Sequence, residues 1–219
     1  MEKAENVTEN GGENTQEKRY FAKVLWGGLL KSRKSAALPG AKIYPPTLTN
    51  SDLANIKIAK EMGVTGVMQP FVRDHSDLEC VKEALREAGA EDIRLFAKIE
   101  NMDGVRKLEK LLPAADEIVI ARGDLGNAVH LWDLPGVQRQ ISEKCRAAGK
   151  PFMVVTQMLA SMERSPVPTR AEVNDIFHAV MDGAASIMVT GETAVGDYPV
   201  EVIRYMVNTV RSAEKEENR

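Results

Sequence analysis

The sequence predicts an α/β protein, a partial TIM-type (β/α) barrel of about five βα units. Short apolar segments alternate with longer helical patterns from residue 46 onward, which is typical of βα units around a parallel sheet. These segments recur roughly every 24 to 35 residues, the spacing of a βα repeat. The repeating part holds about 170 residues, fewer than the ~250 of a typical closed eight-stranded barrel, so these units alone do not close one.

Five segments are predicted to be β-strands, each followed by a helix: residues 66–69, 94–98, 117–121, 152–155 and 186–189. Two capping-box patterns, Ser76 to Glu79 and Thr169 to Glu172, predict where two of the helices begin. Four glycines predict the ends of helices, because glycine readily adopts the left-handed conformation found there: Gly63, Gly89, Gly149 and Gly183.

The composition divides the chain into four parts. Residues 1–19 are polar and charged and predict a disordered arm. Residues 20–40 combine β-favouring side chains with the Gly27-Gly28 pair, which favours a strand or hairpin. Residues 41–213 form the barrel part, and residues 214–219 form a polar tail.

The overall composition excludes several classes of function. Lys and Arg number 29 against 32 Asp and Glu, so no basic excess is available to bind a nucleic acid. The longest apolar runs hold about four to six residues, far fewer than the ~20 that cross a bilayer, so we expect no membrane partner. Two cysteines, Cys80 and Cys145, cannot form a disulfide scaffold and favour a cytoplasmic location.

Charged and hydroxyl residues follow each predicted strand, in segments 69–73, 98–101, 122–126, 156–158 and 190–193. Function collects at the carboxyl ends of the strands in βα architectures, so these segments predict a site. The alternative for any one of them is that charged residues occur simply where the chain meets water. Four consecutive strand ends of this kind are harder to explain in that way.

Two of these strand ends carry the residues of a candidate metal site. Lys98 and Glu100 are two residues apart and point to the same side if the strand continues through them. Glu100 and Asp124 on neighbouring strand ends suit Mg²⁺, and Lys98 would provide a cation for a phosphate or an enolate oxygen. Gly123 would let a backbone N–H approach a bound carboxylate. The alternative is a salt-bridge network of Lys98, Glu100, Arg122 and Asp124.

Several longer stretches are specific enough to indicate a family. They are AKIENMDGVRKLEKL, EIVIARGDLG, RAAGKPFMVVTQMLASM and PTRAEVNDIFHAVMDGAASIMVTGETAVGDYP, preceded by LPGAKIYPPTLTNSDL. In this order and spacing they resemble pyruvate kinase, and the resemblance covers almost all of residues 24–213.

The resemblance implies a role for each candidate residue. Lys98 would stabilise the phosphoryl group during its transfer, and Thr156 would lie near the methylene carbon of the substrate, so both are expected to be catalytic. The backbone at Arg122, Gly123 and Asp124, with Thr156, would bind phosphoenolpyruvate or pyruvate. Glu100 and Asp124 would hold Mg²⁺ or Mn²⁺.

The resemblance also implies parts that this sequence is expected to lack. These are the first three barrel strands, most of the lid domain, of which residues 20–40 would be a remnant, and the C-terminal domain. In the family the absent strands supply an arginine and the K⁺ ligands, so binding of K⁺ is left open. Smaller departures are Gln69-Pro70-Phe71 in place of Ala-Ser-Phe, residues 127–130 (NAVH) in place of VEIP, and Thr190 in place of Ser.

The function implied is a glycolytic, pyruvate-kinase-like phosphotransferase that converts phosphoenolpyruvate and ADP to pyruvate and ATP with Mg²⁺. Whether the isolated chain is active, and whether it binds the nucleotide, are left open. One alternative is a non-catalytic or regulatory module that retains a Mg²⁺ and 2-oxo-acid pocket. Another is a nucleotide-independent enzyme that enolises or decarboxylates a 2-oxo acid. We expect a homo-oligomer or a complex with a chain that supplies the missing strands.

Overall fold

The computed structural model describes residues 23–24, 27–29, 32 and 45–217. The chain divides into two compact units, Met1–Ala36 and Ala37–Arg219. The predicted arm over 1–19 and most of the predicted β-segment over 20–40 lie outside the described residues. The description below therefore concerns the second unit.

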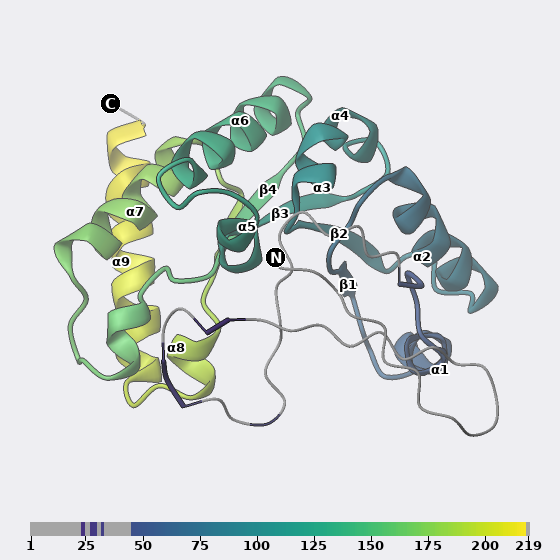
Figure 1. The fold of residues 1–219 in the computed structure, drawn as a ribbon, viewed down its shortest axis with the longest axis horizontal. Helices are drawn as coiled ribbons and strands as arrows, with labels where there is room; N and C mark the ends of the chain where they lie inside the picture. The colour runs from purple at the N-terminus through teal and green to yellow at the C-terminus, as the bar shows by residue number, and fades with distance from the viewer. Residues whose placement is uncertain (1–22, 25–26, 30–31, 33–44, 218–219) are drawn as a thin grey trace. The chain divides into compact units, whose positions relative to one another are not determined.

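The second unit contains a parallel sheet of five strands in the order β1-β2-β3-β4-β5, as Figure 1 shows. The strands are Gly66–Gln69 (β1), Arg94–Ile99 (β2), Glu117–Ala121 (β3), Phe152–Val155 (β4) and Ser186–Met188 (β5). Each strand pairs with its neighbour in the chain, which is the order of a barrel segment, whereas a doubly wound sheet reverses direction partway. The five predicted βα units are confirmed, with strand ends within one residue.

Helices follow the strands, and Figure 1 shows α2, α4, α6 and α7 along the outside of the curved sheet. The helical elements are α1 (Asn50–Ala59), α2 (His75–Glu87), α3 (Met102–Arg106), α4 (Leu108–Leu111), α5 (Arg122–Ala128), α6 (Leu134–Ala147), the 3-10 turn η1 (Ala160–Glu163), α7 (Arg170–Met181), α8 (Gly191–Ala194) and α9 (Pro199–Glu217). Helix α9 packs against α7 and continues into the predicted tail. Among the described residues, no helix is long and apolar enough to span a membrane.

The core has two parts because alternate residues of each strand point to opposite faces of the sheet. Toward the outer helices, Ile118, Ile120 and Val154 belong to a large buried cluster that includes Leu78 of α2 and Ile176 of α7. The opposite face carries a smaller apolar cluster made of Val119, Ala121, Met153 and Val155, with Phe96 and Met188 packed against it. Strand β3 is buried on both faces, which explains the continuous apolar run over residues 118–121.

Helix starts are set by side-chain caps, and one predicted start is wrong. Thr169 and Glu172 form the predicted capping box of α7. Helix α2, however, begins at His75, because the carboxylate of Asp74 accepts a hydrogen bond from the Ser76 backbone N–H and caps the helix. The four glycines predicted at helix ends all adopt positive φ, from 61° at Gly149 to 87° at Gly183.

The amino ends of the strands are joined by a buried carboxylate. Glu117, the first residue of β3, accepts hydrogen bonds from Arg94 of β2 at 3.1 Å and from the Ser186 hydroxyl of β5 at 2.6 Å. Its side chain is almost fully buried, so these partners offset the cost of removing the charge from water. This cluster stabilises the amino edge of the sheet, where the strands begin.

Candidate active site

The strand register places the candidate residues at the carboxyl ends of the strands, the side of the sheet that we call its carboxyl edge. Ile99 of β2 lies opposite Ile120 of β3, and Ala121 of β3 lies opposite Val155 of β4. Glu100, Arg122 and Thr156 each follow at the carboxyl end of one of these strands. The structure therefore brings the predicted strand ends together.

Lys98 and Glu100 form a close ion pair at this edge. The Lys98 ammonium lies 2.8 Å from one oxygen of Glu100, whose other oxygen accepts the Phe71 backbone N–H at 2.7 Å. The Glu100 side chain is 3% exposed and the Lys98 side chain 25%, so the carboxylate is buried while part of the Lys98 side chain contacts solvent. Phe71 has φ of 51°, an unusual conformation for a residue other than glycine.

Helix α5 begins directly after β3, with no intervening loop. Its first residue is Arg122, and no side chain caps its N-terminus. The first N–H groups of a helix have no partner within the helix, and they carry a partial positive charge. Asp124 lies in this first turn and is exposed to solvent. The first turn of α5 is therefore able to bind an anionic group.

Thr156 lies against the first turn of α5 in a strained backbone conformation. A Cβ atom added to Gly123 would lie 3.5 Å from Thr156 Cγ2, which is ordinary van der Waals contact. Thr156 has φ of 77° and Gln157 has φ of 53°, conformations that cost about 1–3 kcal/mol each. The Thr156 hydroxyl donates to the Val155 carbonyl at 2.6 Å.

The alternative of a single four-residue salt-bridge network is only partly present. Lys98 pairs with Glu100, but the Arg122 guanidinium pairs with Asp175 of α7 at 2.7 Å and donates to the Thr156 carbonyl. Asp175 was not among the predicted site residues, because no local pattern marks it among the acidic residues of the helices. Only the tertiary structure relates it to Arg122, 53 positions earlier.

Glu192, the acidic residue after β5, stabilises the loops at this edge. It is 2% exposed, and its carboxylate accepts the backbone N–H groups of Thr190 at 2.8 Å and Leu159 at 3.3 Å. Leu159 belongs to the loop after β4, so Glu192 connects the ends of β4 and β5. Its hydrogen bonds give it a structural role in this edge.

Glu100 and Asp124 offer the oxygen ligands that Mg²⁺ prefers. Among the described residues, no group of three or more His, Cys, Asp or Glu side chains is arranged to hold a metal ion. Mg²⁺ is usually bound by one or two carboxylates, with water and substrate oxygens at its other positions. A pair of carboxylates on neighbouring strand ends, beside a helix N-terminus able to bind an anion, fits that pattern.

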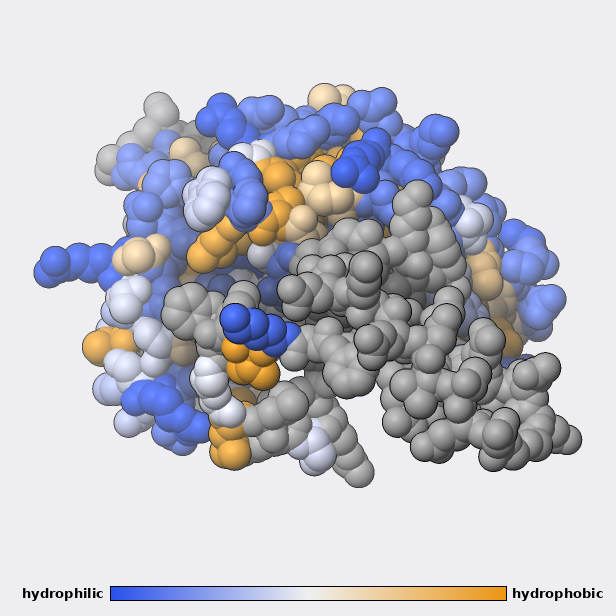
Figure 2. Space-filling model, viewed as in Figure 1, coloured by the Kyte–Doolittle hydropathy of each residue, from blue (hydrophilic) through white to orange (hydrophobic). Residues whose placement is uncertain are grey.

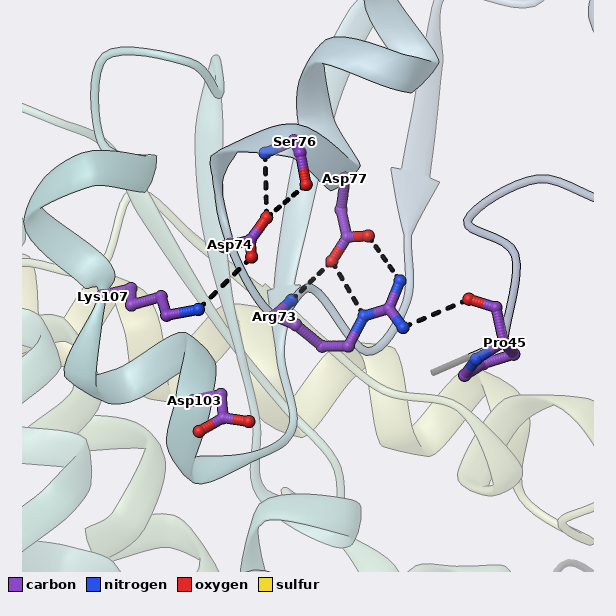
Figure 3. A pocket seen from close by; sticks show the side chains of 7 residues that line it. All are labelled: Pro45, Arg73, Asp74, Ser76, Asp77, Asp103 and Lys107. Carbon is purple, nitrogen blue, oxygen red and sulfur yellow. Dashed lines mark hydrogen bonds and ion pairs between the residues drawn. The ribbon is translucent and has the colours of Figure 1, made fainter. Parts of the chain in front are cut away.

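A polar cavity of about 400 Å³ lies beside the start of α2. Figure 3 shows the side chains that line it: Pro45, Arg73, Asp74, Ser76, Asp77, Asp103 and Lys107. Asp77 is nearly buried and pairs with Arg73 at 2.6 Å and with the Thr47 hydroxyl at 2.6 Å. Partial burial raises the pKa of Asp77, but the hydrogen bonds from Arg73 and Thr47 outweigh burial and lower that pKa to about 2.

A hydrophobic surface lies on the face shown in Figure 2, over the region where α5 and α6 meet. Leu131 and Trp132, in the connection between these helices, are 72% and 78% exposed. The Trp132 ring stacks on His130 with 4.8 Å between ring centroids. Leu131 and Trp132 directly follow residues 127–130, the segment in which the sequence departs from the VEIP pattern, and His130 is its last residue.

Substitution of Asp77 should make stability depend less on pH. The folded-state pKa is lower than the unfolded value, so this carboxylate stabilises the fold above about pH 4 and stabilises it progressively less as the pH falls toward 2. We expect Asp77→Asn to lower the free energy of unfolding by about 1–2 kcal/mol at pH 7, and by roughly half as much at pH 3.

Urea unfolding followed by circular dichroism at both pH values measures this difference. Asp103→Asn is the matched control, because Asp103 lines the same cavity with an exposed side chain. A deficit of the same size at pH 7 and pH 3 would contradict the role given to Asp77.

Comparison with known proteins gives the family of this chain. A family model described as the barrel domain of pyruvate kinase matches residues 8–203. The pyruvate kinase of Bacillus licheniformis is 40% identical over 202 residues, which are 92% of this chain and 34% of that protein. The enzyme of Geobacillus stearothermophilus is 42% identical over 183 residues, 84% of this chain and 31% of that protein. The Candida albicans enzyme is 40% identical over 199 residues, 91% of this chain and 39% of that protein.

This chain thus spans about a third of the length of the curated relatives it matches. Its five parallel strands in barrel order and the strand-end motifs agree with the matched barrel model. The chain belongs to the pyruvate kinase family.

Proposed function

We propose that this chain is a pyruvate-kinase-like phosphotransferase that acts on phosphoenolpyruvate and ADP at the carboxyl edge of its sheet. The proposal rests on one arrangement at this edge. The Lys98–Glu100 ion pair lies at the end of β2, and the uncapped first turn of α5 lies close to Thr156. A cation, a carboxylate and an anion-binding helix N-terminus are the groups that phosphoryl transfer needs, because its catalysis depends on positioning and charge neutralisation.

The first turn of α5 would orient the substrate. Backbone N–H groups at Arg122, Gly123 and Asp124 would bind the carboxylate of phosphoenolpyruvate or pyruvate, supported by the partial positive charge of the helix end. Because a Cβ atom on Gly123 would lie only 3.5 Å from Thr156 Cγ2, a carboxylate bound at Gly123 would have the rest of the substrate near the Thr156 side chain.

Lys98 would neutralise charge on the phosphoryl group. Its ammonium is partly exposed and is anchored on one side by Glu100, so it is able to bind phosphoryl oxygens without leaving its position. Transfer of the phosphoryl group leaves the enolate of pyruvate, which takes up a proton at its methylene carbon. Thr156 would act on that side of the site, in proton delivery or in positioning.

Glu100 and Asp124 would hold Mg²⁺ or Mn²⁺, which supplies charge neutralisation at substrate oxygens when it is bound. The Glu100 carboxylate is already oriented by Lys98 and by the Phe71 N–H, which limits its movement. The proposal includes ADP as the acceptor and leaves K⁺ open. It places the protein in the cytoplasm, in agreement with the two free cysteines, Cys80 and Cys145.

Asp124 should be required for the coupling between metal and substrate. We expect the wild-type chain to bind about one Mn²⁺, and to bind it more tightly when oxalate, a mimic of the enolate, is present, because Mg²⁺-type ions share ligands with substrates. Asp124→Asn should abolish the oxalate effect. Electron paramagnetic resonance of free Mn²⁺ measures both affinities.

The matched control is Asp92→Asn, which removes an exposed carboxylate paired with Lys60 outside the site. Equal oxalate effects in wild type and Asp124→Asn would leave Asp124 without a metal-binding role.

Phosphoryl transfer by the isolated chain should be slow and should depend on Lys98. The chain spans about a third of its relatives, and a single missing transition-state group typically costs ~10²–10⁴ in rate. We therefore expect ATP formation several orders of magnitude below the roughly 1–100 s⁻¹ of kinases, and none from Lys98→Met. Deuterium exchange into the pyruvate methyl group, which needs no nucleotide, should survive better.

The two assays separate the candidate functions. Deuterium exchange into pyruvate with no detectable ATP formation would favour the nucleotide-independent enolising enzyme over the phosphotransferase. Absence of both, with oxalate binding intact, would favour the non-catalytic module. ATP formation at an ordinary kinase rate by the lone chain would contradict the expected loss of activity.

The chain should associate through β1 and β5, the outermost strands of its sheet within the described residues. Within the described residues, β1 and β5 each pair with one strand only, and unpaired strand edges favour pairing with another chain. We expect a homo-oligomer, or a complex with a chain that supplies further barrel strands. Sedimentation velocity at micromolar concentration measures the mass, and a compact, stable monomer would contradict this prediction.

A further inference from the structure

The turn after β4 is held in its strained conformation from outside the turn. Thr156 and Gln157 both have positive φ, and Thr156 is β-branched, which makes this conformation especially unfavourable. A strained backbone persists where surrounding groups over-determine it. The bond from the Thr156 hydroxyl to the Val155 carbonyl is local and does not tie the turn to another element. The contacts that hold the turn must therefore come from another element of the fold.

The Arg122 side chain makes those contacts. Its Nη2 donates to the Thr156 carbonyl at 2.7 Å and lies 2.8 Å from Met158 Sδ, and its Nε donates to the Thr156 carbonyl at 3.2 Å. A longer contact of 3.4 Å reaches the Gln157 carbonyl. One guanidinium thus contacts three consecutive residues of the turn, which its planar set of donors permits and a lysine ammonium does not reproduce.

Asp175 fixes the guanidinium from the other side. Both of its carboxylate oxygens lie close to Arg122 Nη1, at 2.8 and 2.7 Å. The Arg122 side chain is 11% exposed, so its charge is largely removed from water and depends on this partner. Since Asp175 lies on α7, the ion pair connects an outer helix to the turn that carries Thr156.

We propose that Arg122 and Asp175 form a positioning pair that sets the place of the Thr156 side chain relative to the first turn of α5. Arg122 is also the first residue of α5. Its side chain therefore connects the backbone that we propose to bind the substrate carboxylate directly to Thr156. This inference rests on the proposed function and adds to it two side chains that act on Thr156 without contacting substrate. Asp175 belongs to no strand-end motif.

The test uses Asp175→Asn, which keeps the size of the side chain and removes its charge, and Arg122→Lys, which keeps the charge and loses the planar donors. Methyl-labelled threonine gives a nuclear magnetic resonance signal for Thr156, assigned by its loss in Thr156→Ser. We expect this signal to shift or broaden in both variants, while the signal of Thr209, on α9, stays in place.

Deuterium exchange into pyruvate gives the second measurement. We expect Asp175→Asn to lower the exchange rate at saturating pyruvate by about 10²-fold, since a misplacement near 1 Å costs that much. The pyruvate concentration at half-maximal rate should change by less than about threefold, because the carboxylate-binding backbone is retained. Asp175→Glu, which restores the carboxylate, should recover part of the rate.

Asp197→Asn is the matched control, because it removes the carboxylate of an exposed ion pair with Arg164 at 2.9 Å. It should leave both the methyl signal and the exchange rate unchanged. An unchanged Thr156 signal in Asp175→Asn and Arg122→Lys would overturn the proposal, as would a shifted signal with an unchanged exchange rate. If wild type shows neither exchange nor ATP formation, the proposed function fails, and the methyl signal still decides whether the pair positions Thr156.

Discussion

The carboxyl edge of the sheet depends on one constraint: the backbone after β1 and after β4 is held by charged side chains from neighbouring strand ends, and these side chains have little exposure to solvent. Glu100, after β2, holds the Phe71 N–H after β1, and Arg122, after β3, holds the Thr156 carbonyl after β4. Glu192, after β5, holds the Leu159 N–H in the loop after β4. Because parallel strands in register end side by side, each charged group reaches the next loop without crossing the sheet.

Strain is concentrated where these side chains act. Within the described part of the chain, the non-glycine residues with positive φ are Phe71, Thr156 and Gln157, and all three follow strands at this edge. Phe71 and Thr156 each bond to one of the buried charges through a backbone group. Backbone strain of this kind persists only when surrounding contacts hold it, and it is typical of sites whose groups must be placed before substrate binds.

The two edges of the sheet differ in backbone strain and in the exposure of their charged groups. At the amino edge, Glu117 is bonded to Arg94 and Ser186 across three strands, and no strained residue is found there among those described. At the carboxyl edge, Lys98 keeps a quarter of its side chain exposed although it pairs with the buried Glu100, and Asp124 is exposed to solvent. In (β/α) barrels the amino face gives stability and the carboxyl face gives function, and the site that we propose lies on the carboxyl edge of this sheet.

Local properties of the sequence determined most of the fold. Apolar segments at βα spacing predicted the five strands, and single-residue chemistry predicted the Thr169 cap and the helix ends at glycine, since each depends on a few adjacent residues. The start of α2 was misplaced by two residues because Asp74 and Ser76 both offer a capping oxygen, and only the folded backbone selects Asp74. The strand-end motifs likewise predicted that Glu100, Arg122 and Thr156 follow neighbouring strand ends, because parallel register brings strand ends together.

Tertiary structure alone decided what those residues contact. Lys98 and Glu100 were predicted as neighbours because they are two residues apart, but Arg122 reaches Asp175, 53 positions away, and no periodicity or motif relates them. The conformation of Thr156 has the same origin: β-branched residues avoid positive φ, so the sequence alone argues against it. It is adopted because a guanidinium anchored on α7 bonds the turn, an interaction that exists only once strands and helices have packed.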